Sequence, residues 1–296
     1  MNYGILRGME LWNTDVEKKF FTDALNDRFI SPEKLFYTLK SGKFAYVPKD
    51  SDAEGQTLQS RNALIGSFTE TWTKALFEPI AKKLKLFAVN GVECPEIGLP
   101  KRSEADLAFC TTDSKIQSAN NIKLIFEIKM SIVSNYKYIP SNSVEFVGDY
   151  KTHKGNPSLL RSDSMLKAIG KSINIRVSGI DSAEIPIIIL GNSPISDNYV
   201  HKVDFLKTAG VIQGFWSLNP NPTESTFNKV SEKNGFQTIE KHNEIDELCK
   251  KLLNTKLNYF SSMISHKKLG EYIYIANQES TDEAKAEKFL SLIRGI

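Results

Sequence analysis

Two carboxylates and a lysine are spaced so that they could support metal-dependent chemistry. Asp106 lies in the stretch 103–111, and Glu127 and Lys129 lie in the stretch 121–133. Both stretches are rich in apolar, β-branched and aromatic residues, which predicts two strands that are at least half buried. Residues two apart on a strand share a face, so we expect Glu127 and Lys129 to point the same way. If the two strands pair as a hairpin, Asp106 can converge with them.

These three side chains together favour hydrolysis assisted by a divalent cation. Mg²⁺ prefers oxygen ligands and usually binds through one or two carboxylates together with a substrate phosphate. The lysine could position or deprotonate an attacking water, or neutralise the charge that develops on the phosphate. The alternative is a buried ion pair in an ordinary β-hairpin, because a charge in an apolar strand is costly unless it is paired.

Asp106, twenty intervening residues and then Glu127-Ile128-Lys129 resemble the PD-(D/E)XK signature of type II restriction endonucleases and their relatives. Ala105 stands where that family often has proline. The resemblance implies an Mg²⁺-dependent endonuclease, with Mn²⁺ able to substitute, that cleaves double-stranded DNA to 5′-phosphate and 3′-hydroxyl ends. It implies Asp106 and Glu127 as metal ligands, and Lys129 as the residue that positions the water.

A long helix is predicted over 60–85, before the hairpin. Pro79 is expected to kink or interrupt it. Glu70 lies off its apolar stripe, and the resemblance implies an auxiliary acidic role for Glu70; a solvated surface carboxylate is the alternative. Glu104, two residues before Asp106, is the rival for the first carboxylate. The apolar residues that recur at helical spacing are Leu64, Ile65, Phe68, Trp72, Ala75 and Leu76.

The order of the elements from 60 to 222 is helix, hairpin strands, helix, strand, helix, strand. A strand, a helix and a second strand at this spacing form a βαβ unit. The order is similar to the restriction-endonuclease core and implies an α/β fold, with a mixed central sheet flanked by helices. Residues 1–59 are expected to form a helical N-terminal region, and 223–296 a mainly helical C-terminal region. The later core elements are a helix at 161–177, a strand at 184–191, a helix at 197–209 and a strand at 211–218.

Shorter segments are also assigned from their local patterns. Ser31 and Pro32 predict a helix start, with Leu35, Phe36 and Leu39 on its apolar face. In the helix at 161–177, Met165, Leu166, Ile169 and Ile173 are expected to form the buried face. The remaining segments are a polar loop at 48–56, an irregular stretch at 134–160, a helix at 243–265, a short strand at 271–275 and a helix at 281–293.

Basic residues near these elements are candidates for DNA contacts. Aromatic residues alternate with lysines in 134–160, which suits a loop that lies along nucleic acid. The start of the helix at 161 could contact phosphate. Solvated surface residues are the alternative for each. The candidates are Lys101, Arg102, Lys137, Lys151, Lys154, Arg161, Lys167 and Lys171.

Composition sets limits on the class of protein. The chain has no apolar run of membrane-spanning length, and its three scattered cysteines favour neither disulfides nor a zinc site, which predicts a cytoplasmic protein. A net charge of +3 does not by itself establish a nucleic-acid partner. A homodimer is expected if the target is palindromic. The alternatives are a structure-specific repair or recombination nuclease and a non-catalytic DNA-binding protein.

Overall fold

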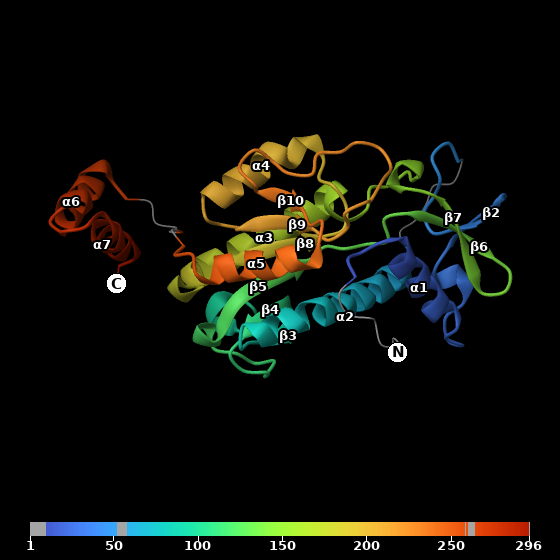
Figure 1. Cartoon of the computed structure of the whole chain (residues 1–296), viewed down its shortest axis with the longest axis horizontal. Coiled ribbons are helices and arrows are strands. Elements are labelled where there is room, and N and C mark those ends of the chain that lie inside the picture. Colours follow the sequence, from blue (N-terminus) through green and yellow to red (C-terminus); the bar gives the residue numbers. More distant parts are fainter. Residues whose placement is uncertain (1–9, 52–57, 258, 260–263, 296) are drawn as a thin grey trace.

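A mixed sheet of six strands forms the centre of the molecule (Figure 1). The computed structural model describes residues 10–51, 58–257, 259 and 264–295. The strand order is β10-β9-β8-β5-β4-β3; β3, β4 and β5 pair antiparallel, whereas β5, β8, β9 and β10 pair parallel. The strands are β3 (Phe87–Val92), β4 (Ala105–Cys110), β5 (Ile122–Ile128), β8 (Ile187–Gly191), β9 (Gly214–Ser217) and β10 (Phe236–Thr238).

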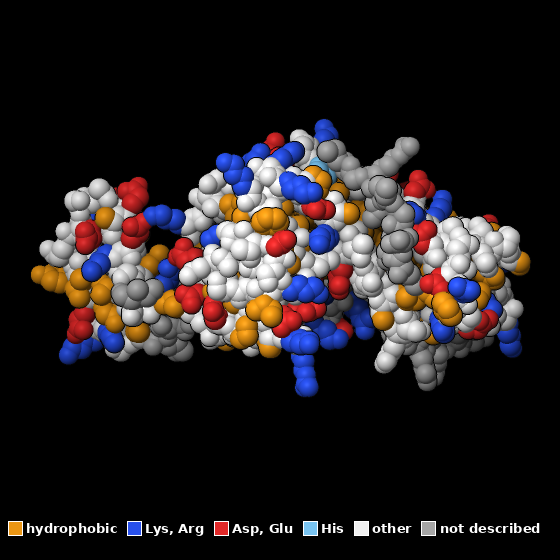
Figure 2. Space-filling view, turned by 90° about the horizontal axis from the view of Figure 1, so that it is seen from below, with side chains coloured by type: hydrophobic (Ala, Val, Ile, Leu, Met, Phe, Trp, Pro, Cys, Tyr) orange, Lys and Arg blue, Asp and Glu red, His pale blue; other side chains and the backbone are white. Residues whose placement is uncertain are grey.

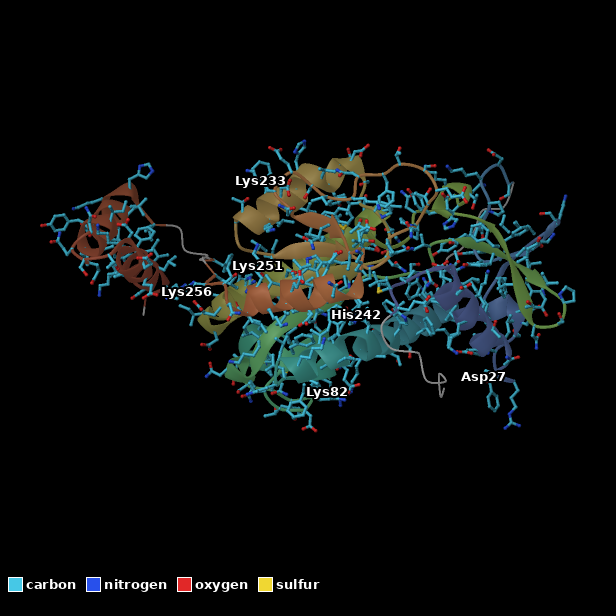
Figure 3. All side chains as sticks on the ribbon, viewed as in Figure 1. Asp27, Lys82, Lys233, His242, Lys251 and Lys256 are labelled. Atoms are coloured by element: carbon cyan, nitrogen blue, oxygen red, sulfur yellow. The ribbon has the colours of Figure 1, made fainter. Side chains whose placement is uncertain are left out.

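Helices cover both faces of this sheet. On one face, α2 (Gln59–Lys83) and α5 (His242–Leu253) pack against alternate side chains of the strands, such as Phe109 and Phe126. On the other face, α3 (Ser162–Ser178) and α4 (Asp197–Thr208) pack against the intervening side chains, such as Ala108 and Ile125. The two helices of the first face are joined where a ring nitrogen of His242 lies 3.2 Å from the carbonyl oxygen of Leu76 (Figure 3). The α/β class predicted from the sequence is thereby confirmed.

A second, antiparallel sheet of four strands lies beside the first, near the N-terminal end of α2 (Figure 1). Its order is β1-β2-β6-β7, and α1 (Thr14–Leu25) packs against it. The chain passes from β5 of the large sheet directly into β6 of the small one, so the segment 129–134 spans their junction. The strands are β1 (Tyr37–Leu39), β2 (Gly42–Phe44), β6 (Asn135–Ile139) and β7 (Ser143–Gly148).

A buried carboxylate ties α1 to this junction. Glu17 accepts hydrogen bonds from the backbone N–H of Val133 (2.5 Å) and of Ser134 (3.1 Å). It also accepts from the indole of Trp12 (2.9 Å) and the hydroxyl of Tyr136 (3.0 Å). Burial raises the pKa of Glu17, and these four donors offset part of that shift. The chain that leaves the candidate site is therefore held by the N-terminal helix.

The βαβ unit and the helices predicted at 60–85, 197–209 and 281–293 are confirmed. The helix predicted at 60–85 is α2, the one at 197–209 is α4, and β8 and β9 are adjacent parallel strands. The helix predicted at 281–293 is α7 (Asp282–Arg294). Pro79 was expected to kink or interrupt this helix, and the interruption is wrong, because α2 continues to Lys83. Proline removes one backbone hydrogen bond, whereas the fully buried side chains on either side of it, Phe77 and Ile80, hold the helix against the sheet.

Several local assignments are wrong because tertiary pairing overrides the local pattern. Only a 3₁₀ turn forms at Pro32–Lys34, and Leu39 lies in β1. The stretch 134–160, expected to be irregular, contains the β6–β7 hairpin. The stretch 271–275, expected to be a strand, lies within α6 (His266–Ala276), which packs against α7. β3 and β10 were not predicted at all.

Element ends and faces differ as well. The strand expected to reach residue 133 ends at Ile128, and the helix expected to reach 265 ends at Leu253. In α3 the predicted buried face is partly wrong: Leu166 is 62% exposed and Ile173 is 44% exposed. The loop predicted at 48–56 is described only as far as residue 51, and 52–57 lie outside the described residues. No helix in the described part of the chain is both long and apolar enough to span a bilayer.

Candidate active site

The β4–β5 hairpin brings the predicted carboxylates together at the end of β5. Leu107 of β4 faces Phe126 of β5 across the antiparallel ladder. Beyond this pair, an oxygen of the Asp106 carboxylate accepts a hydrogen bond of 2.6 Å from the backbone N–H of Ile128. The backbone N–H of Lys129 donates to the carbonyl oxygen of Leu190 in β8 (2.7 Å). The backbone that carries the motif is therefore fixed from both neighbouring strands.

Lys129 lies beside both carboxylates, as expected if the two strands pair as a hairpin. Its ammonium nitrogen lies 2.5 Å from Oε1 of Glu127 and 3.5 Å from Oδ2 of Asp106. Glu127 is almost completely buried, whereas Asp106 and Lys129 keep about a fifth of their side-chain surface exposed (20% and 19%). The cluster thus opens to solvent on the side of Asp106 and Lys129, where a substrate could reach it.

Lys171 of α3 is a second cation in the same cluster. Its ammonium nitrogen lies 2.6 Å from Oε2 of Glu127 and 3.6 Å from Oδ1 of Asp106. It also donates a hydrogen bond to the backbone carbonyl oxygen of Glu104 (2.7 Å). The sequence placed Lys171 among the DNA contacts, on a face with Lys167; the structure instead turns it toward the carboxylates. The signal that could have found it is its position three residues after Ala168, which faces the sheet.

Burial and charge act in opposite directions on this cluster. Burial raises the pKa of Glu127, and the nearby charge of Asp106 raises it further, while Lys129 and Lys171 lower it; the net shift is upward. Burial lowers the pKa of Lys129, but Glu127 and Asp106 outweigh burial, and the net shift is again upward. Lys129 is therefore a protonated ammonium at neutral pH. In this state it can donate hydrogen bonds and neutralise negative charge, but it cannot accept a proton.

Two further carboxylates lie near the cluster. Glu70 of α2 is half-buried, and its pKa is raised first by burial and then by the charges of Asp106 and Glu104. Since these charges act on it, Glu70 belongs to the electrostatic surroundings of the site, although its side chain is still partly exposed to solvent. The side chain of Glu104 packs closely over Gly91 of β3. Its Oε1 atom lies 3.0 Å from where the Cβ atom of any other residue at position 91 would be. Geometry therefore favours Asp106 over Glu104 as the partner of Glu127.

Polar side chains from distant segments hold the backbone after β5. Asn192 accepts a hydrogen bond from the N–H of Ser131 (3.1 Å) and donates one to its carbonyl oxygen (2.6 Å), as a neighbouring strand would. The hydroxyl of Ser158 donates to the carbonyl oxygen of Lys129 (2.7 Å). Ser158 has a φ of +49°, a conformation unfavourable for a non-glycine residue. Sequence reasoning missed both residues, because no motif links them to the hairpin.

The other predicted DNA contacts are dispersed. Lys154 and Arg161 line a pocket beside Lys129. Lys101 and Arg102 lie exposed in the turn before β4, and Lys137 lies in β6. Over the face shown in Figure 2, acidic and basic side chains are intermixed. Lys151 is exposed in a 3₁₀ turn, and Lys167 forms an exposed ion pair with Asp163 (2.9 Å).

The oxygen donors of the cluster are of the type that Mg²⁺ prefers. Among the described residues, no group of three or more His, Cys, Asp or Glu side chains is arranged as a metal site. Two carboxylates would still suffice for Mg²⁺ together with water and a substrate phosphate. Oε2 of Glu127 is buried without a directed hydrogen bond, and the ammonium of Lys171 faces it. A metal ion bound to this oxygen would therefore compete with Lys171, whose ammonium nitrogen lies 2.6 Å away.

Comparison with protein-family models, with curated proteins and with solved structures gives no match. Function is therefore inferred from the geometry of Asp106, Glu127, Lys129 and Lys171, and from the chemistry of these groups.

Proposed function

We propose that the protein is an Mg²⁺-dependent endonuclease that hydrolyses phosphodiesters of double-stranded DNA, similar to type II restriction endonucleases. The observation that carries the proposal is the position of Lys129, 2.5 Å from Glu127 and 3.5 Å from Asp106 at the open end of a buried hairpin. A mixed sheet with helices on both faces also supports it, because that arrangement is the one the family resemblance implies. The restriction-endonuclease-like core is part of the proposal.

In this proposal Asp106 and Glu127 hold the metal. Bound Mg²⁺ lowers the pKa of a coordinated water and stabilises negative charge on phosphoryl oxygens. Lys129, as an ammonium, donates hydrogen bonds that orient the attacking water and neutralise the developing charge. Water adds to phosphorus and the bond to the 3′-oxygen breaks, which leaves a 5′-phosphate and a 3′-hydroxyl. Glu70 acts as an auxiliary acidic residue.

Lys171 gives a specific reason to keep a second candidate. Two ammonium groups neutralise two carboxylates, so the cluster satisfies itself without a metal. A structural ion-pair network in a non-catalytic DNA-binding protein would have this arrangement. Metal binding separates the two candidates: the nuclease binds Mn²⁺ in a way that Asp106→Asn abolishes, whereas the structural network shows no such binding.

The proposal is tested by digestion of long duplex DNA from several genomes, with Mg²⁺ or with EDTA. We expect discrete fragments that require Mg²⁺ and disappear in Asp106→Asn and Lys129→Ala. Asp113→Asn, in the exposed β4–β5 connection, and Lys123→Ala, at the other end of β5, are the matched controls and should cleave normally. Structure-dependent nicks in place of discrete bands would point to a repair or recombination nuclease. Intact DNA together with no Mn²⁺ binding would contradict the proposal.

A homodimer and a cytoplasmic location complete the proposal. A symmetric dimer is the assembly that matches a palindromic target. Light scattering of the protein, alone and with its DNA target, tests the assembly: a mass of two chains on one duplex is expected, and one chain per duplex would contradict it.

A further inference from the structure

A cavity of about 680 Å³ adjoins Lys129 at the junction of the two sheets. Its walls come from the first turns of α2, from the segment after β5, from the loop at 154–158 and from the start of α3. Four of its lining side chains are cationic, and its lining contains no carboxylate side chain. The cations are Arg61, Lys129, Lys154 and Arg161.

Arg61 is buried in the wall of this cavity without an anionic partner among the described residues. It is 3% exposed. Its guanidinium donates to the carbonyl oxygen of Ala45 and to the hydroxyl of Tyr37 (3.4 Å), and lies 4.9 Å from the ring centres of Tyr37 and Tyr46. Its Nε–H has no hydrogen-bond partner. A guanidinium has five N–H donors, and burial of an unpaired cation is unfavourable, so the site is suited to an anion.

The size and the polar lining of the cavity indicate more than a bare phosphate. A volume of about 680 Å³ falls within the range of pockets that hold small organic ligands, roughly 300–1,000 Å³. The side-chain amides of Asn62 and Asn156 line it and can pair with the edge of a base. An intact duplex cannot enter such a pocket, whereas a single nucleotide turned out of the stack can.

We propose that this cavity binds one nucleotide unit, with its phosphate on Arg61 and Arg161 and its base against Asn62 and Asn156. The nucleotide comes from the DNA strand that runs past Lys129, and in this respect the inference rests on the proposed nuclease function. A free nucleoside phosphate has the same chemistry, and the experiments separate the two sources.

The first experiment needs neither metal nor cleavage. Calorimetric titration of the wild type in EDTA compares the four 2′-deoxynucleoside 5′-monophosphates with inorganic phosphate and with deoxynucleosides. At least one monophosphate should bind at least tenfold more tightly than phosphate or nucleoside, and Arg61→Met should weaken it at least tenfold. Arg28→Met, an exposed arginine next to Phe29, is the matched control. No monophosphate binding, or equal binding by Arg61→Met, overturns the proposal.

Asn156→Asp keeps the test valid if Arg61→Met fails to fold. Asn156 is exposed in a loop, and the new carboxylate would repel the phosphate inside the cavity, so binding should again fall at least tenfold. Asn120→Asp, in the exposed β4–β5 connection, is its control and should bind normally. Unchanged binding of the monophosphate by Asn156→Asp would contradict the proposed position of the nucleotide in the cavity.

The second experiment identifies the source of the nucleotide. Asp106→Asn is mixed, in EDTA, with duplexes that carry 2-aminopurine at each position in turn. A several-fold rise in fluorescence at one position, reversed by the monophosphate or lost in Asn156→Asp, supports a nucleotide extruded from the strand. Monophosphate binding without any rise overturns the strand source and leaves a free nucleotide as ligand. DNA cleavage without monophosphate binding refutes only the pocket, and monophosphate binding together with intact DNA and no Mn²⁺ binding refutes only the nuclease.

Discussion

The ammonium nitrogen of Lys171 lies 2.6 Å from Oε2 of Glu127, on the oxygen that Lys129 does not contact. Two lysines from different elements, one after β5 and one in α3, therefore share one buried carboxylate. This contact ties α3 to the end of the hairpin. It also supplies the positive charge that allows Asp106 and Glu127 to stay close together without a metal.

Replacement of Lys171 by methionine should destabilise the protein mainly at neutral pH. Glu127 would keep Lys129 but lose its second cation, and we expect a loss of about 2 kcal/mol in the free energy of unfolding. The pKa of Glu127 is already raised, so the loss should shrink as the pH falls through that pKa and the carboxyl becomes neutral in the folded state. Urea unfolding at several pH values measures it.

Lys167→Met is the matched control for this stability measurement. Lys167 lies one turn before Lys171 and forms an exposed ion pair with Asp163, for which about 0.5 kcal/mol or less is expected. Equal effects of Lys167→Met and Lys171→Met, or a loss that does not depend on pH, would contradict the role assigned to Lys171.

Glu70→Gln should stabilise the protein at neutral pH. The pKa of Glu70 in the folded state is raised by burial and by Asp106 and Glu104. A carboxyl with a raised pKa is harder to ionise in the folded state than in the unfolded state. The free energy of unfolding therefore falls as the pH rises through that pKa. Removal of the charge should raise the free energy of unfolding by about 0.5 kcal/mol at neutral pH, a small effect because solvent screens the partly exposed charge. In acid, where the carboxyl is already neutral, the free energy of unfolding should not change.

The control for Glu70→Gln is Glu78→Gln, two turns later on α2. Glu78 pairs with the exposed Lys82 (3.1 Å), so removal of its charge should leave stability unchanged or slightly lower. Thermal unfolding of both variants across the acidic to neutral range compares them. A loss of stability in Glu70→Gln at neutral pH would show that its charge is favourable where it lies.

Glu17→Ala should destabilise the protein by about 3 kcal/mol, because buried donors would lose their acceptor. Those donors include the backbone N–H groups of Val133 and Ser134, in the segment that follows Lys129. Asp15→Ala, on the exposed side of the same helix, should change stability by less than about 1 kcal/mol. Urea unfolding followed by tryptophan fluorescence measures both variants, and equal losses would refute the role of Glu17 as an anchor.

Much of the fold follows from local patterns, and the failures have physical causes. The long helix α2 and the parallel strands β8 and β9 combine clear periodicity with many buried side chains, so their assignment was confirmed. In β3 the apolar residues are interrupted by Asn90 and Gly91, and the strand forms by pairing with the edge of β4. The residues of α6 alternate in a strand-like way, yet no strand lies beside them, and they pack as a helix against α7.

The core of the candidate site was predictable, but its surroundings were not. The period of a strand and the hairpin were enough to bring Asp106, Glu127 and Lys129 together. The ion pairs of Lys171 with the carboxylates were not predicted, because small residues such as Ala168 face the sheet in α3 while the larger Leu166 is exposed. Arg61 reaches its cavity only through the packing of the two sheets, and no spacing in the sequence reports that contact.

The most direct test of the central claim is the rate of DNA cleavage at saturating protein as a function of Mg²⁺ concentration. Wild type, Asp106→Asn and Lys129→Ala are compared with Lys123→Ala. The account predicts cleavage that rises with Mg²⁺ and saturates, that is about 10³-fold slower in Asp106→Asn and Lys129→Ala, and that is unchanged in Lys123→Ala. Cleavage by the wild type that persists in EDTA, or that survives in Asp106→Asn, would contradict it.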